Sequence, residues 1–180
     1  LAYMIPLGLG QALTIKVSHS MGRGEPLEAR QICLTGFKLI FVFALILGSL
    51  KILLRHDFAQ LFSPEPEVQI IAASLFFFSA ALGCFDSMQM ASSGALRGYK
   101  DAKVPLIIQI IAFWVIAFPI AYSLALTDLW GEPIGVYGFW IGLVIAACLA
   151  SLMMLYRWNV VSKSAINNPD EAIIAVAGQK

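Results

Sequence analysis

The sequence predicts an all-α integral membrane protein with five transmembrane helices, and three observations support this prediction. Of the 180 residues, 59% are apolar and only 13% are charged, whereas soluble domains average about 45–50% apolar and about 25% charged residues. The mean hydropathy is +0.81. The apolar residues gather in long runs between short polar connectors, and a helix needs about 20 such residues to cross a bilayer.

Five runs qualify as spans. Each is expected to be a helix rather than an open strand, because a lipid-exposed backbone must satisfy its own hydrogen bonds. The runs are residues 1–17, 32–54, 68–96, 104–126 and 134–156.

The order of the elements follows from the residues between and within these runs. The first run is rich in Leu, Ile and Gly, and the connector MGRGEP at residues 21–26 ends it. Ser63, a candidate N-cap, and a Pro-Glu-Pro sequence precede the third run, which is long enough to overshoot the hydrocarbon. Pro119 predicts a kink in the fourth run. Gly138 and Gly142 form a GxxxG in the fifth, which is typical of close helix contact.

The last part of the chain is more polar. We therefore expect residues 1–157 to form a transmembrane bundle and residues 158–180 to form a cytoplasmic polar tail. Arg97 and Asp101, four residues apart, are expected to form an ion pair at a helix end.

The positions of lysine and arginine predict the orientation. With these spans, ten of the twelve lie on one side of the membrane, and only Lys51 and Arg55 lie on the other. Because positive residues favour the cytoplasm, residue 1 is expected outside and the tail inside. The ten are Lys16, Arg23, Arg30, Lys38, Arg97, Lys100, Lys103, Arg157, Lys163 and Lys180.

Several functional classes find no support. The net charge of +1 provides no strong field for nucleic acid. Cys33, Cys84 and Cys148 are far apart and lack metal-binding spacing. The sequence contains no GxSxG, HExxH or Walker motif, so no enzymatic activity and no cofactor are expected.

Asp86 is the outlier of the third run. It precedes Arg97 by eleven residues, which places it roughly 16 Å below that end of the helix and near the middle of a hydrocarbon core about 30 Å thick. A carboxylate there costs about 2.5–3.5 kcal/mol on insertion scales. Two interpretations remain: a structural hydrogen bond to a neighbouring helix, or binding of a proton or Na⁺. We favour the second, because intramembrane acids are usually functional.

Other polar residues share faces with Asp86 or with one another. Ser79, Asp86 and Ser93 are seven residues apart, and Gln89 follows Asp86 by three, so they form one polar face of a helix. That face is expected to point into the bundle or a water-filled cavity. The candidate cavity-lining residues are Gln89, Ser93, Ser79, Gln11, Thr14 and Gln109.

Four stretches carry a family resemblance. They are MIPLGLGQA at residues 4–12 with MGRG at 21–24; DSMQ at 86–89 leading to GALRGYKD at 94–101; Phe113-Trp114 to Pro119 and Tyr122; and GVYGFWIG at 135–142. Over about residues 1–160 the chain is similar to the NorM-like branch of the MATE (multidrug and toxic compound extrusion) transporters. The sequence departs from that pattern at Leu82, where a tyrosine is common, and at Ser18, where glycine is usual.

The resemblance implies a fold of twelve helices in two six-helix lobes. The chain would supply helices eight to twelve, which is the C-terminal lobe without its first helix, and seven helices would precede it. The implied setting is the bacterial inner membrane, with the lipid bilayer and the missing N-terminal helices as partners.

The resemblance also implies export of cationic or amphipathic drugs in antiport with Na⁺ or H⁺. Asp86 matches the acidic residue of the tenth helix that takes part in cation coupling, and would be a Na⁺ ligand in a sodium-coupled protein. Two alternatives remain. The first is a flippase for lipid-linked oligosaccharides, which the lack of Lys or Arg deep in the spans disfavours. The second is a non-transporting membrane subunit or integral membrane enzyme with a structural Asp86.

Overall fold

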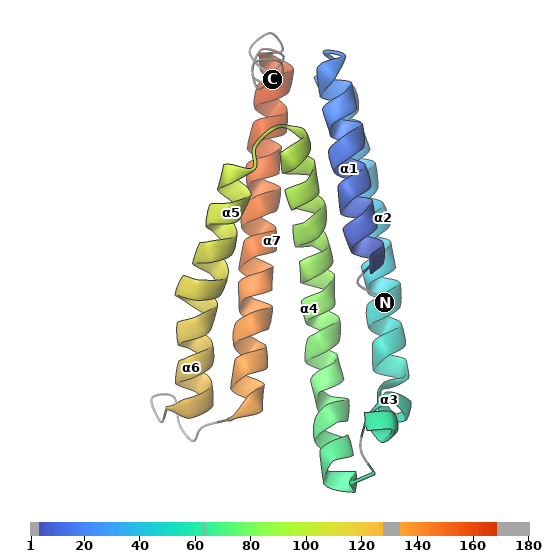
Figure 1. Ribbon diagram of the computed structural model, residues 1–180, viewed down its shortest axis with the longest axis vertical. Coiled ribbons are helices and arrows are strands. Elements are labelled where there is room, and N and C mark those ends of the chain that lie inside the picture. Colours follow the sequence, from blue (N-terminus) through green and yellow to red (C-terminus); the bar gives the residue numbers. More distant parts are fainter. Residues whose placement is uncertain (1–3, 63, 128–133, 169–180) are drawn as a thin grey trace.

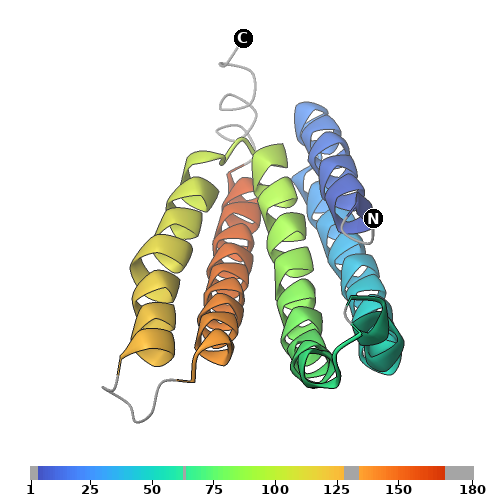
Figure 2. The ribbon, with the colours of Figure 1, turned by 60° about the horizontal axis from the view of Figure 1, so that its bottom comes forward.

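The computed structural model describes residues 4–62, 64–127 and 134–168, and over these residues it is a bundle of helices without strands (Figure 1). Long helices run alternately up and down, side by side (Figure 2). In chain order they are α1 (Met4–Gly22), α2 (Pro26–Leu53), the short α3 (Arg55–Phe62), α4 (Pro66–Gly98), α5 (Lys103–Ile110), η1 (Ile111–Ala117), α6 (Phe118–Leu126) and α7 (Val136–Asn167).

Four spans in the described residues are long and apolar enough to cross a membrane: α2, α4, α7 and the continuous helix Lys103–Leu126. The prediction of an all-helical membrane bundle is confirmed. The first expected span does form a helix, α1, but α1 is not among the four. Its sequence explains this, because Gln11, Lys16 and His19 interrupt its apolar residues.

Pro119 lies beside an irregular stretch of the fourth span. The preceding residues, Ile111–Ala117, form a π-helix, and the backbone N–H of Phe118 donates to the carbonyl of Phe113, five residues earlier. Proline provides no N–H for the helix. The wider turn therefore occurs where regular α-helical hydrogen bonding is interrupted.

The predicted boundary at residue 157 is too early. Helix α7 continues to Asn167, and the side chains of Trp158 and Ser162 are buried. Arg30 of α2 donates to Ser162 Oγ at 2.5 Å and to Asn159 Oδ1 at 2.9 Å, and its guanidinium lies 5.1 Å from the centre of the Trp158 ring. Residues 158–167 therefore belong to the bundle. The remainder of the expected tail, residues 169–180, lies outside the described residues, as does Ser63.

The expected ion pair between Arg97 and Asp101 is wrong. Arg97 Nε donates to the carbonyl of Ser93 in its own helix. The carboxylate of Asp101 instead accepts a 2.7 Å hydrogen bond from Arg157 Nε. The turn after α4 reverses direction through Lys100, which has a φ of 64°, and this change of direction places Asp101 against α7.

Helix α4 packs against α1, α2 and α7 and so occupies the centre of the bundle. Small residues let its neighbours approach closely. A Cβ at Gly94 would lie only 2.3 Å from the carbonyl oxygen of Gly10 in α1. Thr14 Oγ1 bridges the same contact, donating to the carbonyls of Gly94 at 2.9 Å and Gly10 at 3.1 Å.

The GxxxG of α7 forms a second close contact, as the sequence predicts. A Cβ at Gly138 would lie 2.7 Å from the backbone nitrogen of Ala125, and one at Gly142 would lie 2.8 Å from Cβ of Ala121. Both neighbours belong to α6, so these glycines set the distance between α6 and α7.

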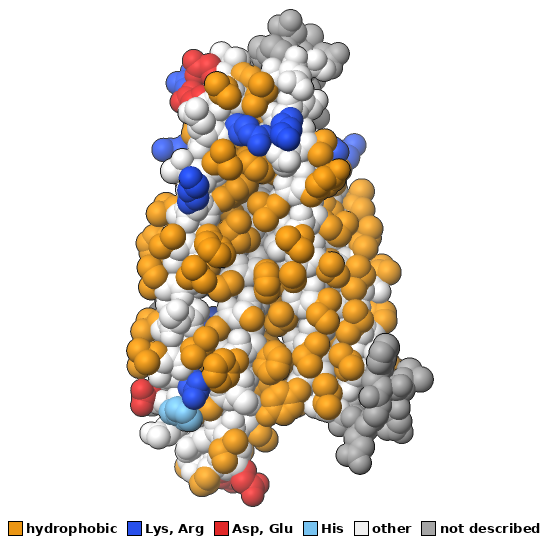
Figure 3. All heavy atoms as spheres, turned by 180° about the vertical axis from the view of Figure 1, so that it is seen from behind, with side chains coloured by type: hydrophobic (Ala, Val, Ile, Leu, Met, Phe, Trp, Pro, Cys, Tyr) orange, Lys and Arg blue, Asp and Glu red, His pale blue; other side chains and the backbone are white. Residues whose placement is uncertain are grey.

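The surface matches a membrane environment. Apolar side chains cover the middle of the visible face, Lys and Arg side chains gather toward its upper end, and few lie near the lower end (Figure 3). We call the end that carries the α1–α2 turn and the last turns of α4 and α7 the basic end, and the opposite end the α3 end. Arg23 at the basic end pairs with Glu25 and Glu28.

The contact between Gly10 and Gly94 leads to a stability prediction. Gly94→Ala should lower the midpoint of thermal unfolding of the purified protein in detergent. The added methyl must displace backbone, and overpacking of this kind costs about 1–3 kcal/mol, more than the gain of up to about 1 kcal/mol in helix propensity. Gly8→Ala is the matched control, because a Cβ at Gly8 meets no atom within 4 Å. A Gly94→Ala protein as stable as the control would contradict the described approach of α1 to α4.

Candidate functional site

Asp86 lies in α4, and its half-buried side chain lines a small pocket of about 70 Å³ between α1, α2 and α4. Helix α1 contributes one residue to this pocket, and α2 and α4 contribute the rest. The other lining residues are Pro6, Ala44, Leu47, Gly48, Lys51, Ala80, Gly83 and Ser87.

Small residues create this pocket. A Cβ at Gly48 of α2 would lie 3.5 Å from Cys84 Sγ and 3.8 Å from Cβ of Ala80, so α2 and α4 are in contact there. The thiol of Cys84 also donates to the carbonyl of Ala44 at 3.6 Å. The same small side chains leave the space beside Asp86 unfilled, and this space is large enough for a water molecule or a small cation.

The carboxylate of Asp86 forms no hydrogen bond or ion pair with any residue that the structure describes. The nearest hydroxyl in sequence, Ser87 Oγ, donates instead to the carbonyl of Gly83 at 2.6 Å. Charged groups inside a membrane usually pair with one another or with backbone groups. An acid that does not pair within its bundle is available to bind a proton or a cation.

Lys51 reaches the same pocket from α2. Its Nζ donates to Ser79 Oγ at 3.4 Å and lies 3.6 Å from the position that a Cβ at Gly83 would take. Lys51 belongs to the last turn of α2, so it does not lie deep in a span, but its side chain brings a cation into the Asp86 pocket. Its spacing in the sequence carried a signal, because Ala44, Gly48 and Lys51 lie on one face of a helix, and small residues on that face indicate close packing.

The other candidate polar residues are not gathered around Asp86. Gln89 is buried and donates from Nε2 to Gln109 Oε1 of α5 at 2.6 Å. Oε1 of Gln89 is buried with no partner in the described part of the chain. These two glutamines therefore connect α4 to α5, whereas the Asp86 pocket lies between α4 and the pair α1 and α2.

The remaining candidates have separate positions. Thr14 is used in the contact of α1 with α4, and Gln11 is exposed on α1. Ser93 is half-buried on the face of α4 that also carries Asp86. None of the six candidate cavity-lining residues is among those that line the Asp86 pocket. Ser79 is linked to it indirectly, because it accepts a hydrogen bond from Lys51.

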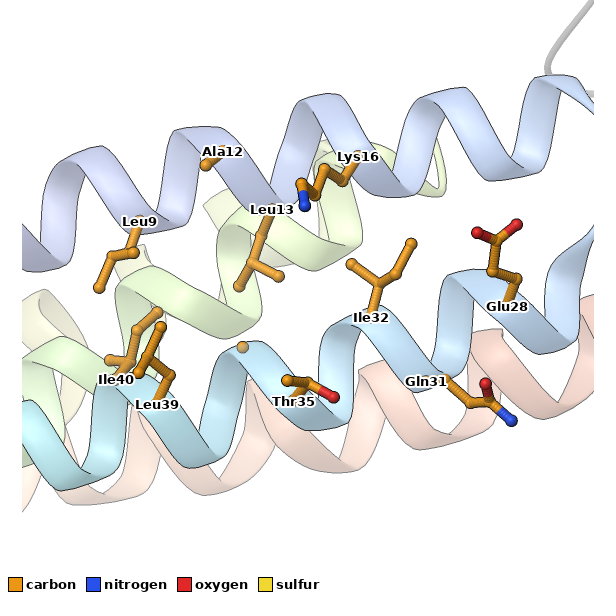
Figure 4. A pocket seen from close by; sticks show the side chains of 11 residues that line it. Leu9, Ala12, Leu13, Lys16, Glu28, Gln31, Ile32, Thr35, Leu39 and Ile40 are labelled. Atoms are coloured by element: carbon orange, nitrogen blue, oxygen red, sulfur yellow. The ribbon is translucent and has the colours of Figure 1, made fainter.

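A larger groove of about 470 Å³ separates α1 from α2 nearer the basic end. Figure 4 shows apolar side chains such as Leu13 and Ile40 on its walls, with Lys16 near the middle and Glu28 toward one end. Neither Asp86 nor any of the six candidates lines it. The groove and the Asp86 pocket are therefore distinct.

A single acidic residue does not form a metal centre. Among the described residues there is no cluster of three or more His, Cys, Asp or Glu side chains that could hold a metal ion. A hard cation bound at Asp86 would need further oxygen ligands, whereas a proton would need only the carboxylate.

Comparison with known proteins gives consistent results. The MatE family model matches residues 1–123. The chain is 43% identical over 157 residues to the multidrug resistance protein PmpM of Pseudomonas aeruginosa, a match that covers 87% of this chain and 33% of that protein. The chain thus spans about a third of the length of this relative.

The fold has a counterpart among solved structures. The crystal structure of the eukaryotic MATE transporter AtDTX14 superposes with a TM-score of 0.79 and 25% sequence identity, covering 93% of this chain and 38% of that protein. The helical arrangement described above is therefore that of part of a MATE transporter.

The hydrogen bond between the two glutamines is testable by a double-mutant cycle. Gln89→Leu and Gln109→Leu should show a coupling free energy of unfolding of about 0.6–1.7 kcal/mol, the range for polar pairs inside membrane bundles. Unfolding by a denaturing detergent would provide the measurement. As a control, Gln89→Leu combined with Gln11→Leu should be additive, because Gln11 is exposed on another helix. Additivity of the first pair would show that the bond contributes nothing.

Proposed function

The chain belongs to the MatE family, and we propose that it forms the C-terminal part of a secondary transporter that exports cationic or amphipathic drugs in exchange for Na⁺ or H⁺. The name of its relative, a multidrug resistance protein, supports drugs as the cargo. The likeness to a MATE transporter structure supports transport by the whole protein. No enzymatic step is part of this proposal.

One observation supports the exchange of ions most directly. Asp86 lies within a membrane-spanning helix, lines a pocket, and has no partner among the described residues. A carboxylate in this setting gains most from binding a positive ion, because little water is available to solvate its charge. Occupation of the pocket by an ion therefore has a large energetic effect on the protein.

This energetic effect provides a means of coupling. If the ion and the drug each favour a different access state, binding of one shifts the population away from the state that binds the other. The same coupling free energy applies in both directions. The electrochemical gradient of the ion can then drive export of the drug, without ATP.

The identity of the ion depends on the ligands around Asp86. The pocket offers one carboxylate and one ammonium, from Asp86 and Lys51, with the Ser87 hydroxyl already bonded to backbone. A proton requires no further ligand, whereas Na⁺ would require oxygen atoms from helices that precede this chain.

The proposed setting is the bacterial inner membrane, with the basic end in the cytoplasm. Lys100 and Lys163 at this end are exposed, whereas α3 and its neighbours carry few cations. In this orientation residue 1 lies outside and the C-terminus lies inside. Upstream helices of the same transporter would complete the twelve-helix fold and the drug cavity.

The role of Asp86 is tested by drug efflux. In cells that carry the full-length protein, Asp86→Asn should reduce ethidium or norfloxacin efflux at least tenfold, because the amide keeps the size of the side chain but cannot bind a proton or pair with a cation. Asp86→Glu keeps the charge and should retain part of the activity. Efflux by Asp86→Asn equal to wild type, at equal expression in the membrane, would end the proposed coupling role.

The proposed orientation is tested by labelling with a membrane-impermeant maleimide. In a cysteine-free background, Gln60→Cys in α3 should react in intact cells, because Gln60 is exposed at the α3 end. Ser164→Cys, exposed near the end of α7, should react only after the membrane is permeabilised. The reverse labelling pattern would invert the topology.

A further inference from the structure

Lys51 is a charged residue with no acidic partner. Its ammonium forms no ion pair within 4 Å in the described part of the chain, and its one hydrogen bond goes to the neutral hydroxyl of Ser79. That bond is 3.4 Å long, longer than the usual range of about 2.7–3.2 Å for N–H···O bonds, and therefore weak. An ammonium has three donors, so this position uses little of its capacity.

The direction of the side chain is informative. A lysine close to the end of a membrane helix usually extends outward to reach water. Lys51 lies in the last turn of α2 but points to α4, since its Nζ lies beside Ser79 and Gly83. Its position therefore indicates an interaction within the protein.

The antiparallel arrangement directs Lys51 and Asp86 toward one another. Side chains lean toward the N-terminus of their own helix. Helix α2 begins at the basic end and α4 begins at the α3 end, so Lys51 leans toward the middle of the bundle. Asp86, nearer the middle, leans toward the α3 end. The two side chains line the same pocket.

The Lys51 ammonium lies about one helix turn from Asp86 along α4. Gly83 lies three residues before Asp86 and so on the adjacent turn, and Lys51 Nζ already lies 3.6 Å from where its Cβ would be. Because Gly83 has no side chain, the path along α4 toward Asp86 is open. The pocket of about 70 Å³ can accept an ammonium group.

We propose that Lys51 is the internal counter-ion of Asp86: its ammonium leaves Ser79 and neutralises the carboxylate whenever no transported ion occupies the pocket. This inference rests on the proposed function and adds a residue that sets the affinity for the ion. An arriving Na⁺ or H⁺ displaces the ammonium, which returns to Ser79. The ammonium therefore competes with the transported ion and lowers its affinity for Asp86.

Few other groups affect this exchange. Lys51 is the single cation among the residues that line the pocket, and no second acid lines it. The thiol of Cys84 faces the same contact and is bonded to the carbonyl of Ala44. Arg55, the next cation toward the α3 end, is stacked on Phe77 with 4.6 Å between its guanidinium and the ring centre.

The test is exchange of drug for ion by the full-length protein in proteoliposomes, with Na⁺ and H⁺ varied separately. Lys51→Met removes the charge and keeps the length of the side chain. The ion concentration that gives half-maximal exchange should fall on the order of a hundredfold, as expected for loss of a unit charge about one helix turn away at an effective dielectric constant of about 20. Lys51→Arg keeps the charge and should change this concentration by less than about threefold.

Lys38→Met is the matched control, because it removes a lysine from an exposed position on the same helix. It should leave the half-maximal ion concentration unchanged. A concentration for Lys51→Met equal to that of Lys38→Met would overturn the counter-ion proposal. Asp86→Asn in the same assay separates the two proposals. If this variant abolishes exchange, a failure of the counter-ion proposal leaves the proposed function intact. Full exchange by Asp86→Asn would overturn the proposed function itself.

A loss of folding also has a defined interpretation. If Lys51→Met cannot be purified in a folded state, the double variant with Asp86→Asn decides. Recovery of folding when both charges are removed supports pairing of the two residues. A double variant as unstable as Lys51→Met alone would show that Lys51 has a separate structural role, and would overturn the proposal.

Discussion

A charged group inside a bilayer has little water to solvate it, and this constraint shapes the bundle around α4. Polar side chains of the interior have to find partners within the protein. Gln89 bonds to Gln109, Thr14 bonds to two carbonyls, and Ser92 bonds to the carbonyl of Met88 one turn earlier. A few neutral atoms such as Gln89 Oε1 also lack a partner in the described residues, but Asp86 carries a carboxylate with no hydrogen bond or ion pair there. Its unmatched charge therefore distinguishes the proposed exchange site from ordinary helix packing.

Close helix contacts make such a site possible. Gly94 of α4 lies against Gly10 of α1, and Gly48 of α2 lies against Ala80 of α4. Helices α1 and α2 therefore contact α4 at two different heights. The contacts fix the spacing of the helices, and the absence of large side chains leaves space beside Asp86. A pocket defined by backbone positions keeps its shape when its occupant changes, which is useful for a site that must bind and release an ion in each cycle.

The extent to which the sequence predicts this structure depends on the kind of interaction. Span lengths and connectors come from local composition, so the predicted third and fourth spans agree with their helices to within a few residues. The predicted second span begins later than α2 does, and the predicted fifth span ends earlier than α7 does. The end of α7 was missed because its pattern is short. Trp158, Ser162 and Ala165 recur at helical spacing, but the polar residues between them resemble a tail.

Pairings between helices were beyond the reach of the sequence. Asp101 has two arginines within range, four and 56 residues away. The direction that the chain takes after Lys100 places the Asp101 carboxylate next to Arg157. For Asp86, the sequence shows the acid and its approximate depth, but the inward direction of Lys51 depends on the packing of α2 against α4.

A pocket with one acid and one mobile cation has a consequence for alternating access. In the proposed mechanism, the Asp86 carboxylate is balanced by Lys51 when the site is empty and by the transported ion when it is loaded. The protein therefore does not have to change its access state with an uncompensated carboxylate in the hydrocarbon, where insertion scales give an acidic residue a cost of about 2.5–3.5 kcal/mol. Both states of the site remain accessible, and the weaker affinity that results from the competing ammonium favours release of the ion on the side where its concentration is low.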